Sequence, residues 1–135
     1  MTNSSNLIDS LEVYTLSNPN EVKPHWVSHF IVPTTNELLI KINTKEGNSG
    51  FGMATSYTDI APIIKPFKNG LQDLIIGEDP FCPEKIYNKI FKLTDTRISS
   101  EKGWSREALI RITAALDIAC WDLIGKAANI PLYEL

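Results

Sequence analysis

The sequence predicts an α+β fold, in which a three-stranded antiparallel sheet is followed by a three- to four-helix bundle. Strand-like alternation is confined to the stretch from Leu7 to Thr55, whereas helical spacing of apolar residues dominates from Thr58 onward. Two of the strands are separated by a short turn, which makes the sheet antiparallel. With 135 residues and 43% hydrophobic content, the chain is expected to form one domain with a buried core.

The first strand is predicted at Leu7 to Thr15, where β-prone residues alternate with polar or aromatic neighbours. From Leu16 to Asn36 the sequence holds three prolines and no sustained periodicity, which predicts a long loop. Loops of this length within a compact domain are usually functional lids or disordered segments. A lid is favoured by the aromatic and histidine side chains of this stretch, which are His25, Trp26, His29 and Phe30.

A hairpin is predicted between Leu38 and Thr55. Its first strand, Leu38 to Thr44, alternates regularly, and the sequence KEGN supplies turn residues before the second strand, Gly50 to Thr55. The cluster GNSGFG leaves a phosphate-binding loop open as an alternative. Such loops follow a strand and open a helix, whereas this cluster joins two strands, so the hairpin is favoured.

The stretch that follows predicts shorter helical pieces before a final long helix. The first piece begins near Thr58 and is ended or kinked by Pro66. The second spans Leu71 to Ile76, and the third begins at Pro83. Thr94 to Gly103 is expected to be a polar loop. The predicted buried face of the third piece comprises Ile86, Tyr87, Ile90 and Leu93.

The longest helical signal runs from Arg106 to Ala128. Ser105 is placed to cap its first turn, and Asn129 followed by Pro131 ends it. Its apolar residues form two stripes, so this helix is expected to be sandwiched between packing partners. The first stripe comprises Leu109, Ile112, Leu116, Ala119, Cys120, Leu123 and Ala127, and the second comprises Ile110, Ala114, Ile118, Trp121 and Ala128. The remaining polar arc holds Arg111, Asp122 and Lys126.

Asp117 has a helical angle that falls inside the apolar arc, where an unpaired carboxylate would be costly. It is either an acid, a base or a metal ligand, or a structural carboxylate that accepts hydrogen bonds from a neighbouring segment. The structural interpretation is favoured, because a metal or acid–base site needs several converging groups and this helix offers one. The sequence shows no histidine–carboxylate cluster and no nucleophile beside a base, so no catalytic residue and no metal ligand is assigned to this chain.

The net charge of −3 is spread along the chain and forms no basic patch, which argues against nucleic acid and anionic membranes as partners. No apolar run approaches the length of a membrane span, and the amino-terminal residues lack the basic and apolar regions of an export signal. A cytoplasmic location is therefore expected. The spacing of Cys82 and Cys120 suggests neither a metal site nor a disulfide framework, so both are expected to be reduced thiols.

The carboxy-terminal segment ALIRITAALDIACWDLIGKAANIPLYEL resembles the helix that closes the N-terminal domain in the mandelate racemase and muconate lactonizing enzyme family of the enolase superfamily. The family pattern A-[IL]-D-[IM]-A-x-W-D-x-x-G-K-x-x-x-x-P-[LV] is met by Ala115, Leu116, Asp117, Ile118, Ala119, Trp121, Asp122, Gly125, Lys126, Pro131 and Leu132. Two weaker matches lie upstream, in TKEGNSGFG and in IIGEDPFCPEKIYNKIF. The resemblance covers nearly the whole chain, so residues 1–135 are expected to form one capping domain of the enolase N-terminal type.

The resemblance implies a function that this chain cannot perform alone. In the family, the capping domain precedes a modified TIM barrel, which holds the catalytic residues and the three carboxylates that bind Mg²⁺. A barrel takes about 250 residues and is absent from this chain. The implied enzyme is a magnesium-dependent lyase or isomerase that abstracts the proton alpha to a carboxylate, as a racemase, a cycloisomerase or an acid-sugar dehydratase. Its implied partners are the barrel domain, a carboxylate-containing small molecule and further copies of the enzyme in a homo-oligomer.

The resemblance also places two loops of the cap over the mouth of the barrel, at Leu16 to Asn36 and at Phe51 to Tyr57. Many relatives have glutamate at the position of Met53, so this chain departs from the pattern beside the pocket. The candidate substrate-contacting residues are His25, Trp26, His29, Phe51, Met53 and Tyr57. The alternatives are ordinary surface residues for the first three and packing at the sheet edge for the others. A freestanding α+β binding or interaction module without catalysis is the competing function.

Overall fold

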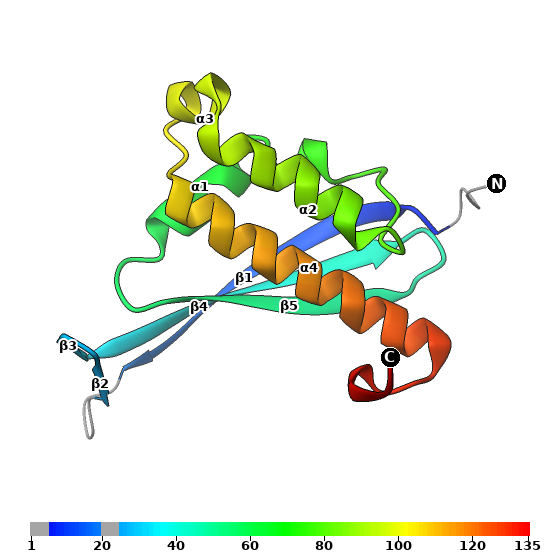
Figure 1. Cartoon of the computed structure of the whole chain (residues 1–135), viewed down its shortest axis with the longest axis horizontal. Helices are drawn as coiled ribbons and strands as arrows, with labels where there is room; N and C mark the ends of the chain where they lie inside the picture. The colour runs from blue at the N-terminus through cyan, green and yellow to red at the C-terminus, as the bar shows by residue number, and fades with distance from the viewer. Residues whose placement is uncertain (1–5, 20–24) are drawn as a thin grey trace.

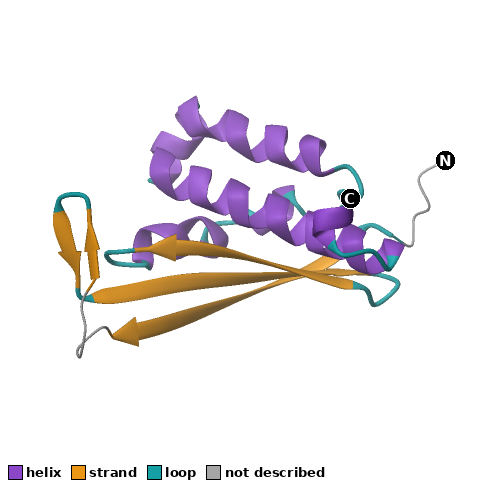
Figure 2. Cartoon of the chain, turned by 60° about the horizontal axis from the view of Figure 1, so that its bottom comes forward, coloured by secondary structure: helices purple, strands orange, loops and turns teal. Residues whose placement is uncertain are grey.

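The main sheet lies under a layer of helices, and its other face carries no helix of the described residues (Figures 1 and 2). The computed structural model describes residues 6–19 and 25–135. In this part of the chain, the main sheet has the strand order β1-β4-β5 and is antiparallel throughout. The predicted α+β class with a three-stranded antiparallel sheet is confirmed. The strands are β1 (Ile8–Pro19), β4 (Thr34–Thr44) and β5 (Ser49–Ser56), and β2 (His25–Val27) pairs with β3 (Phe30–Val32) in a separate ribbon.

Four α-helices follow the strands in the described residues, as the sequence predicted for this half of the chain. They are α1 (Ala61–Lys68), α2 (Pro83–Phe91), α3 (Arg97–Lys102) and α4 (Arg106–Ala128), with short 3-10 turns at η1 (Gln72–Leu74), η2 (Lys92–Asp95) and η3 (Leu132–Glu134). None of these described helices is both long and apolar enough to cross a bilayer. The bounds predicted for the final helix are confirmed, and Ser105 caps it by accepting a hydrogen bond from the Ala108 amide.

The long loop predicted from Leu16 to Asn36 is wrong for the residues that the structure describes. Strand β1 continues to Pro19, which pairs with Thr34, and the β2–β3 ribbon occupies much of the remainder. Residues 20–24 lie outside the described part of the chain. Most described side chains of β2 and β3 are exposed, so the segment lacks the apolar alternation that identifies a half-buried strand. Of its described prolines, Pro19 is the last residue of β1 and Pro33 lies between β3 and β4, so neither stands in the interior of a strand.

Three predictions for the helical half are corrected. The polar loop predicted at Thr94 to Gly103 contains η2 and α3; the buried part of α3 is limited to Ser99, which explains its polar composition. Helix α1 continues past Pro66 to Lys68. Tyr87, predicted to be buried, lies on the exposed face of α2 and stacks on Phe91 with ring centroids 5.5 Å apart.

The core lies between the sheet and α4. Alternate residues of β4 are completely buried, as are the α4 residues of the first predicted stripe, apart from Ala127. The second stripe is exposed along its length in this chain. The largest buried side chains at this interface are Leu38, Ile40 and Ile42 from β4 and Leu109, Ile112, Leu116 and Leu123 from α4. Each such side chain, when fully buried, contributes about 1.5–3 kcal/mol to folding.

The backbones of α4 and β5 come into direct contact. Gly50 and Gly52 are buried on the helix-facing side of β5. A Cβ atom at Gly50 would lie 2.0 Å from the carbonyl oxygen of Ala119, and one at Gly52 would lie 1.8 Å from that of Ala115. The two glycines are therefore required by the approach of the helix. Because they lie within a strand, the phosphate-loop alternative for GNSGFG is wrong.

The polar arc of α4 covers the free edge of β5. Asp122 accepts a hydrogen bond of 2.8 Å from the Phe51 amide, and Lys126 donates to the Ser49 carbonyl at 3.3 Å and to Asp122 at 2.5 Å. Arg111 donates to the Thr55 carbonyl farther along the strand. Unpaired main-chain groups at a sheet edge can pair with another chain, and charged side chains protect against this. The polar arc thus holds the helix in register with the strand.

The uncovered face of the sheet carries a polar cluster. Glu12 accepts hydrogen bonds of 2.8 Å from both Lys41 and Asn43, and it also accepts one from the Tyr14 hydroxyl. These donors favour the ionised carboxylate, and the Lys41 hydrogen bond contributes most to lowering the pKa of Glu12 to about 2. The cluster ties β1 to β4 across the exposed face.

Replacing Gly52 with alanine is expected to separate α4 from β5. The added methyl group would meet the Ala115 carbonyl, so Gly52→Ala should lower the free energy of unfolding by roughly 1–3 kcal/mol, as overpacked core positions do. Met53→Ala on the opposite face of β5 is the control and should cost about 0.5 kcal/mol. Urea denaturation of the two variants measures the difference. Equal midpoints for Gly52→Ala and the parent would contradict the close approach.

The Glu12 cluster predicts a stability change in acid. The pKa of Glu12 in the folded state lies below its ordinary value of about 4.5. The contribution of ionised Glu12 to the stability of the fold is therefore complete above pH 4.5 and is lost as the pH falls towards about 2. Glu12→Gln should flatten this part of the curve of unfolding free energy against pH. Lys41→Met should do the same, since it removes the first cause of the shift. Denaturation curves between pH 2 and pH 6 test this, and an unchanged slope in both variants would refute it.

Candidate functional site

One end of the sheet gathers the segments that the sequence singled out as loops. Because the strands are antiparallel, the end of β1, the start of β4 and the end of β5 lie at the same end, where the β2–β3 ribbon projects beyond the helices (Figure 1). Asn36 of β4 pairs with Ser17 on one side and with Ser56 on the other. The turn that follows β5, beginning at Tyr57, therefore lies at the base of the ribbon.

A side-chain hydrogen bond joins β4, at the base of the β2–β3 ribbon, to this turn. The Asn36 amide group donates to the Thr58 carbonyl oxygen at 2.7 Å. Within the turn, the Ser56 hydroxyl donates to the Asp59 carbonyl at 3.3 Å and accepts from the Thr58 amide at 3.4 Å. Neither Asn36 nor Thr58 was singled out from the sequence, since only the strand register shows that they meet.

The ribbon carries three of the six predicted site residues. Trp26 pairs with Ile31 across the ribbon, and its side chain is 71% exposed. His29 is exposed in the turn between β2 and β3. His25 is the first residue of β2 and pairs with Val32. The segment that the sequence predicted to be a lid is therefore a projecting hairpin rather than an irregular loop.

The other three predicted site residues are divided between two places. The second predicted loop, Phe51 to Tyr57, is wrong as a loop, because residues as far as Ser56 belong to β5. Phe51 and Met53 lie on the uncovered sheet face, where Lys126 sits 4.7 Å from the centroid of the Phe51 ring. Tyr57 lies just past β5 at the ribbon end. Phe51 lies five positions before Ser56 in the extended strand, a distance of about 17 Å. The structure thus brings Tyr57, and not Phe51, to the ribbon.

Asp117 lies half-buried on α4, and its hydrogen bond is with Trp121 of the same helix rather than with a neighbouring segment. Burial raises the pKa of its carboxyl group, and a hydrogen bond with Trp121 opposes this effect by lowering it. In the part of the chain that the structure describes, no three His, Cys, Asp or Glu side chains are grouped so that they could hold a metal ion. The thiol of Cys120 is buried, which raises its pKa to about 12 and keeps it protonated at neutral pH.

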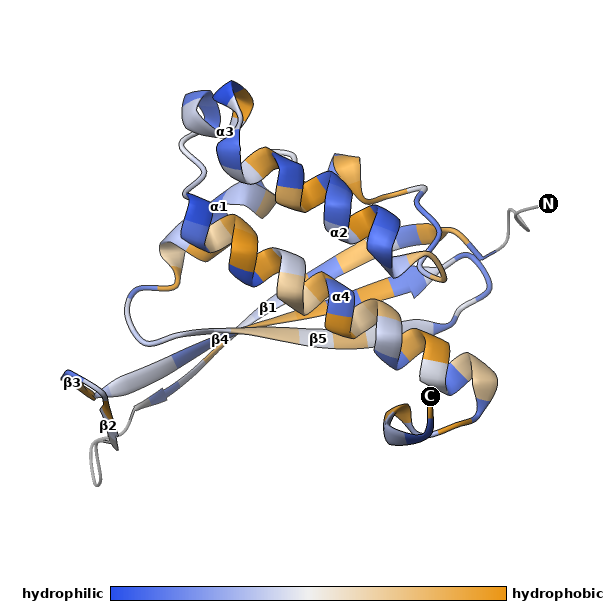
Figure 3. Cartoon of the chain, in the orientation of Figure 1, coloured by the Kyte–Doolittle hydropathy of each residue, from blue (hydrophilic) through white to orange (hydrophobic). Residues whose placement is uncertain are grey.

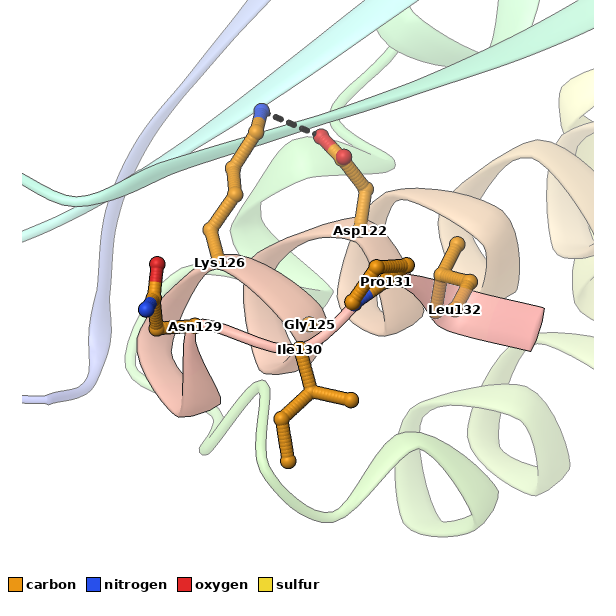
Figure 4. Close-up of a pocket in the computed structure, with 7 residues that line it drawn as sticks. All are labelled: Asp122, Gly125, Lys126, Asn129, Ile130, Pro131 and Leu132. Carbon is orange, nitrogen blue, oxygen red and sulfur yellow. Dashed lines mark hydrogen bonds and ion pairs between the residues drawn. The ribbon is translucent and has the colours of Figure 1, made fainter. Parts of the chain in front are cut away.

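A hollow of about 500 Å³ lies where the chain leaves α4 (Figure 4). Asn129 adopts a left-handed conformation, and the Ile130 amide donates to the Gly125 carbonyl at 3.0 Å, so the last residues fold back towards the helix. In Figure 4, Lys126 and Asp122 point toward each other, forming the ion pair described above. Both polar groups are thus engaged in holding β5, and this hollow shows no pairing of a nucleophile with a base.

The amino-acid sequence matches a known family over most of its length. Residues 10–135 match the family described as the mandelate racemase / muconate lactonizing enzyme N-terminal domain. A D-galactonate dehydratase family member from Pseudarthrobacter chlorophenolicus is 29% identical over 104 residues, which are 76% of this chain and 24% of that protein. A D-gluconate/D-galactonate dehydratase from Picrophilus torridus is 28% identical over 128 residues, 95% of this chain and 29% of that protein.

The fold also agrees with that of a solved structure. A dipeptide epimerase from Enterococcus faecalis V583, solved with Mg and the dipeptide L-Leu-L-Tyr, superposes with a TM-score of 0.72 at 23% identity, over 95% of this chain and 34% of that one. The chain therefore spans about a quarter of the length of the curated relatives and a third of this solved structure. The match over residues 10–135, with this fold, shows that the chain belongs to the mandelate racemase / muconate lactonizing enzyme family, as an N-terminal domain.

Proposed function

We propose that the chain is the capping and substrate-specificity domain of a magnesium-dependent lyase or isomerase that abstracts the proton alpha to a carboxylate. The observation that carries the proposal is the family match over residues 10–135 in a chain that spans about a quarter of its curated relatives. The larger enzyme would supply the reacting groups from a C-terminal barrel domain. The cap would supply the ribbon and the Tyr57 turn, which lie together at one end of the sheet.

The ribbon and the turn have the surface properties that such a cover needs. Trp26, Phe30 and Ile31 are exposed apolar side chains on a projecting hairpin, and Tyr57 is 37% exposed beside its base. Apolar segments that close over a pocket exclude water and strengthen the polar interactions inside it. We assign substrate contact to the ribbon residues His25, Trp26 and His29 and to Tyr57. Packing on the sheet face is the favoured role for Phe51 and Met53, given their separation from the ribbon.

The activities for which the relatives are named favour a sugar acid as the substrate. The Picrophilus torridus relative is a dehydratase of D-gluconate and D-galactonate, and a relative from Rhizorhabdus wittichii, 31% identical over 104 residues, is a D-mannonate dehydratase. All three of these compounds are polyhydroxylated carboxylates. Dehydration of such an acid begins with removal of the proton beside the carboxylate, which is the reaction step proposed above. Acid-sugar dehydration is therefore the first activity to test, ahead of racemisation and cycloisomerisation.

Magnesium would stabilise the enolate that forms when the proton is removed. The dipeptide epimerase of the same fold was solved with Mg, which supports this part of the proposal. In residues 6–19 and 25–135 of this chain, no group of three metal-binding side chains comes together. We therefore place the magnesium ligands in the barrel domain. The cap's own residues would bind and orient the substrate and exclude water.

The 135-residue chain alone is expected to show no turnover of D-galactonate, D-gluconate or D-mannonate, and no micromolar affinity for Mg²⁺. The reason is that proton abstraction beside a carboxylate needs a base and a metal, and we place both outside this chain. Assays of product formation and isothermal titration of the pure chain measure the two quantities. The chain extended into its barrel is the positive control. Steady turnover by the chain alone would refute the proposal. If the coding sequence after residue 135 encodes no barrel, the freestanding binding module would be favoured.

The chain alone is also expected to self-associate through its uncovered apolar surface. Figure 3 shows apolar residues along α4 and in the segment that follows it. Ile118→Lys should weaken the association, and Ile98→Lys, an equally exposed position on α3, is the matched control. Sedimentation velocity over a range of concentrations measures the effect. A parent chain that stays monomeric at high concentration would contradict a covering partner for this surface, whose residues are Ile110, Ile118, Trp121, Leu132, Tyr133 and Leu135.

A further inference from the structure

Asn36 lies at the point where the three-stranded sheet narrows to two strands, β1 and β4, on the side of the β2–β3 ribbon. It pairs with Ser17 of β1 and with Ser56, the last residue of β5. Beyond it, β4 pairs with β1 alone, as far as the Thr34–Pro19 pair. From Asn36 towards the β2–β3 ribbon, β4 is therefore held by one neighbouring strand instead of two.

The Asn36 side chain joins this junction to the turn that follows β5. Its amide group donates to the Thr58 carbonyl at 2.7 Å, across 22 positions of sequence. The Ser56 hydroxyl accepts a hydrogen bond from the Thr58 amide and donates one to the Asp59 carbonyl, and these bonds hold the shape of the turn. They do not connect it to β4. The Asn36 hydrogen bond is a long-range contact that sets the position of the turn relative to β4. Through β4, it also sets the position of the turn relative to the β2–β3 ribbon.

The end of β5, just before the turn, is anchored separately. The Thr55 hydroxyl donates to the Glu37 carboxylate at 2.7 Å, and the Thr55 carbonyl accepts from Arg111 of α4. On β4, the partner of the anchored β5 end is Glu37, and the partner of the turn is the adjacent residue Asn36. Tyr57 is thus held between Ser56, which is fixed in the sheet, and Thr58, which is fixed to Asn36.

We propose that Asn36 is a positioning residue that couples the ribbon to the Tyr57 turn, so that the two segments keep a fixed separation and move as one unit. The consequence for substrate binding rests on the proposed function, because it requires these segments to cover the substrate. The coupling itself requires only the hydrogen bond. Asparagine suits the position because its amide donates to a carbonyl, whereas an ionised aspartate has no donor.

The coupling is tested in the 135-residue chain by amide hydrogen exchange of residues 57–61. Asn36→Ala should speed exchange there roughly two- to tenfold, which is the effect of losing one hydrogen bond, while amides of α4 stay protected. Asn43→Ala is the matched control, because it removes side-chain donors at the opposite end of β4, where Asn43 bonds Ser10 and Glu12. Asn36→Gln keeps an amide donor and should restore part of the protection. Unchanged exchange in Asn36→Ala, or equal acceleration in Asn43→Ala, would overturn the coupling.

A second measurement separates the coupling from the proposed function. In the enzyme that carries this chain, Asn36→Ala should raise KM for whichever of D-galactonate, D-gluconate and D-mannonate is turned over, by roughly two- to tenfold, with kcat nearly unchanged. Asn43→Ala should leave KM unchanged. Faster amide exchange together with an unchanged KM would uphold the coupling and overturn the covering role of the turn. An unchanged exchange rate would overturn the coupling whatever the KM.

Discussion

The direct contact of the α4 backbone with β5 is the constraint on which the rest of the fold depends. Gly50 and Gly52 leave the helix-facing side of β5 without side chains, and the Ala115 and Ala119 carbonyls occupy the space. This approach brings the large apolar side chains of α4 down onto β4. It also sets the height of the helix above the sheet and hence the space available to α1 and α2. The two glycines permit this contact because they have no Cβ atom, and the backbone of α4 fills the space that a Cβ atom would occupy.

The same contact explains why the charged residues of α4 are arranged along one line. Asp122 and Lys126 hold the start of β5, and Arg111 holds its end. A helix packed on small residues could shift along the strand, because no side chains interlock there to fix its position. The three polar attachments fix that register. They also occupy a sheet edge that would otherwise be free to pair with another chain.

The sequence predicted most of the fold because its packed parts have regular patterns. The bounds of α4, its buried stripe and the hairpin of β4 and β5 all follow from periodicity and turn residues. The β2–β3 ribbon was missed because it is short and most of its described side chains are exposed, and α3 was missed because only Ser99 is buried in it. The candidate site was predicted in part. Tyr57 and Trp26 do lie at one end, but Asn36 could not be found, since its partner is set by a strand register that the sequence does not display.

The β1–β4 ladder extends past the end of β5 towards the β2–β3 ribbon. Past Asn36 the β1–β4 ladder has no third strand beside it, so its length is set by nothing in the packed body. Pairs of residues added to or removed from both strands would move the tip by about 7 Å per pair and keep every side chain on its original face. Evolution can therefore adjust the reach of this segment towards differently sized ligands while the helices and their glycine contacts stay unaltered.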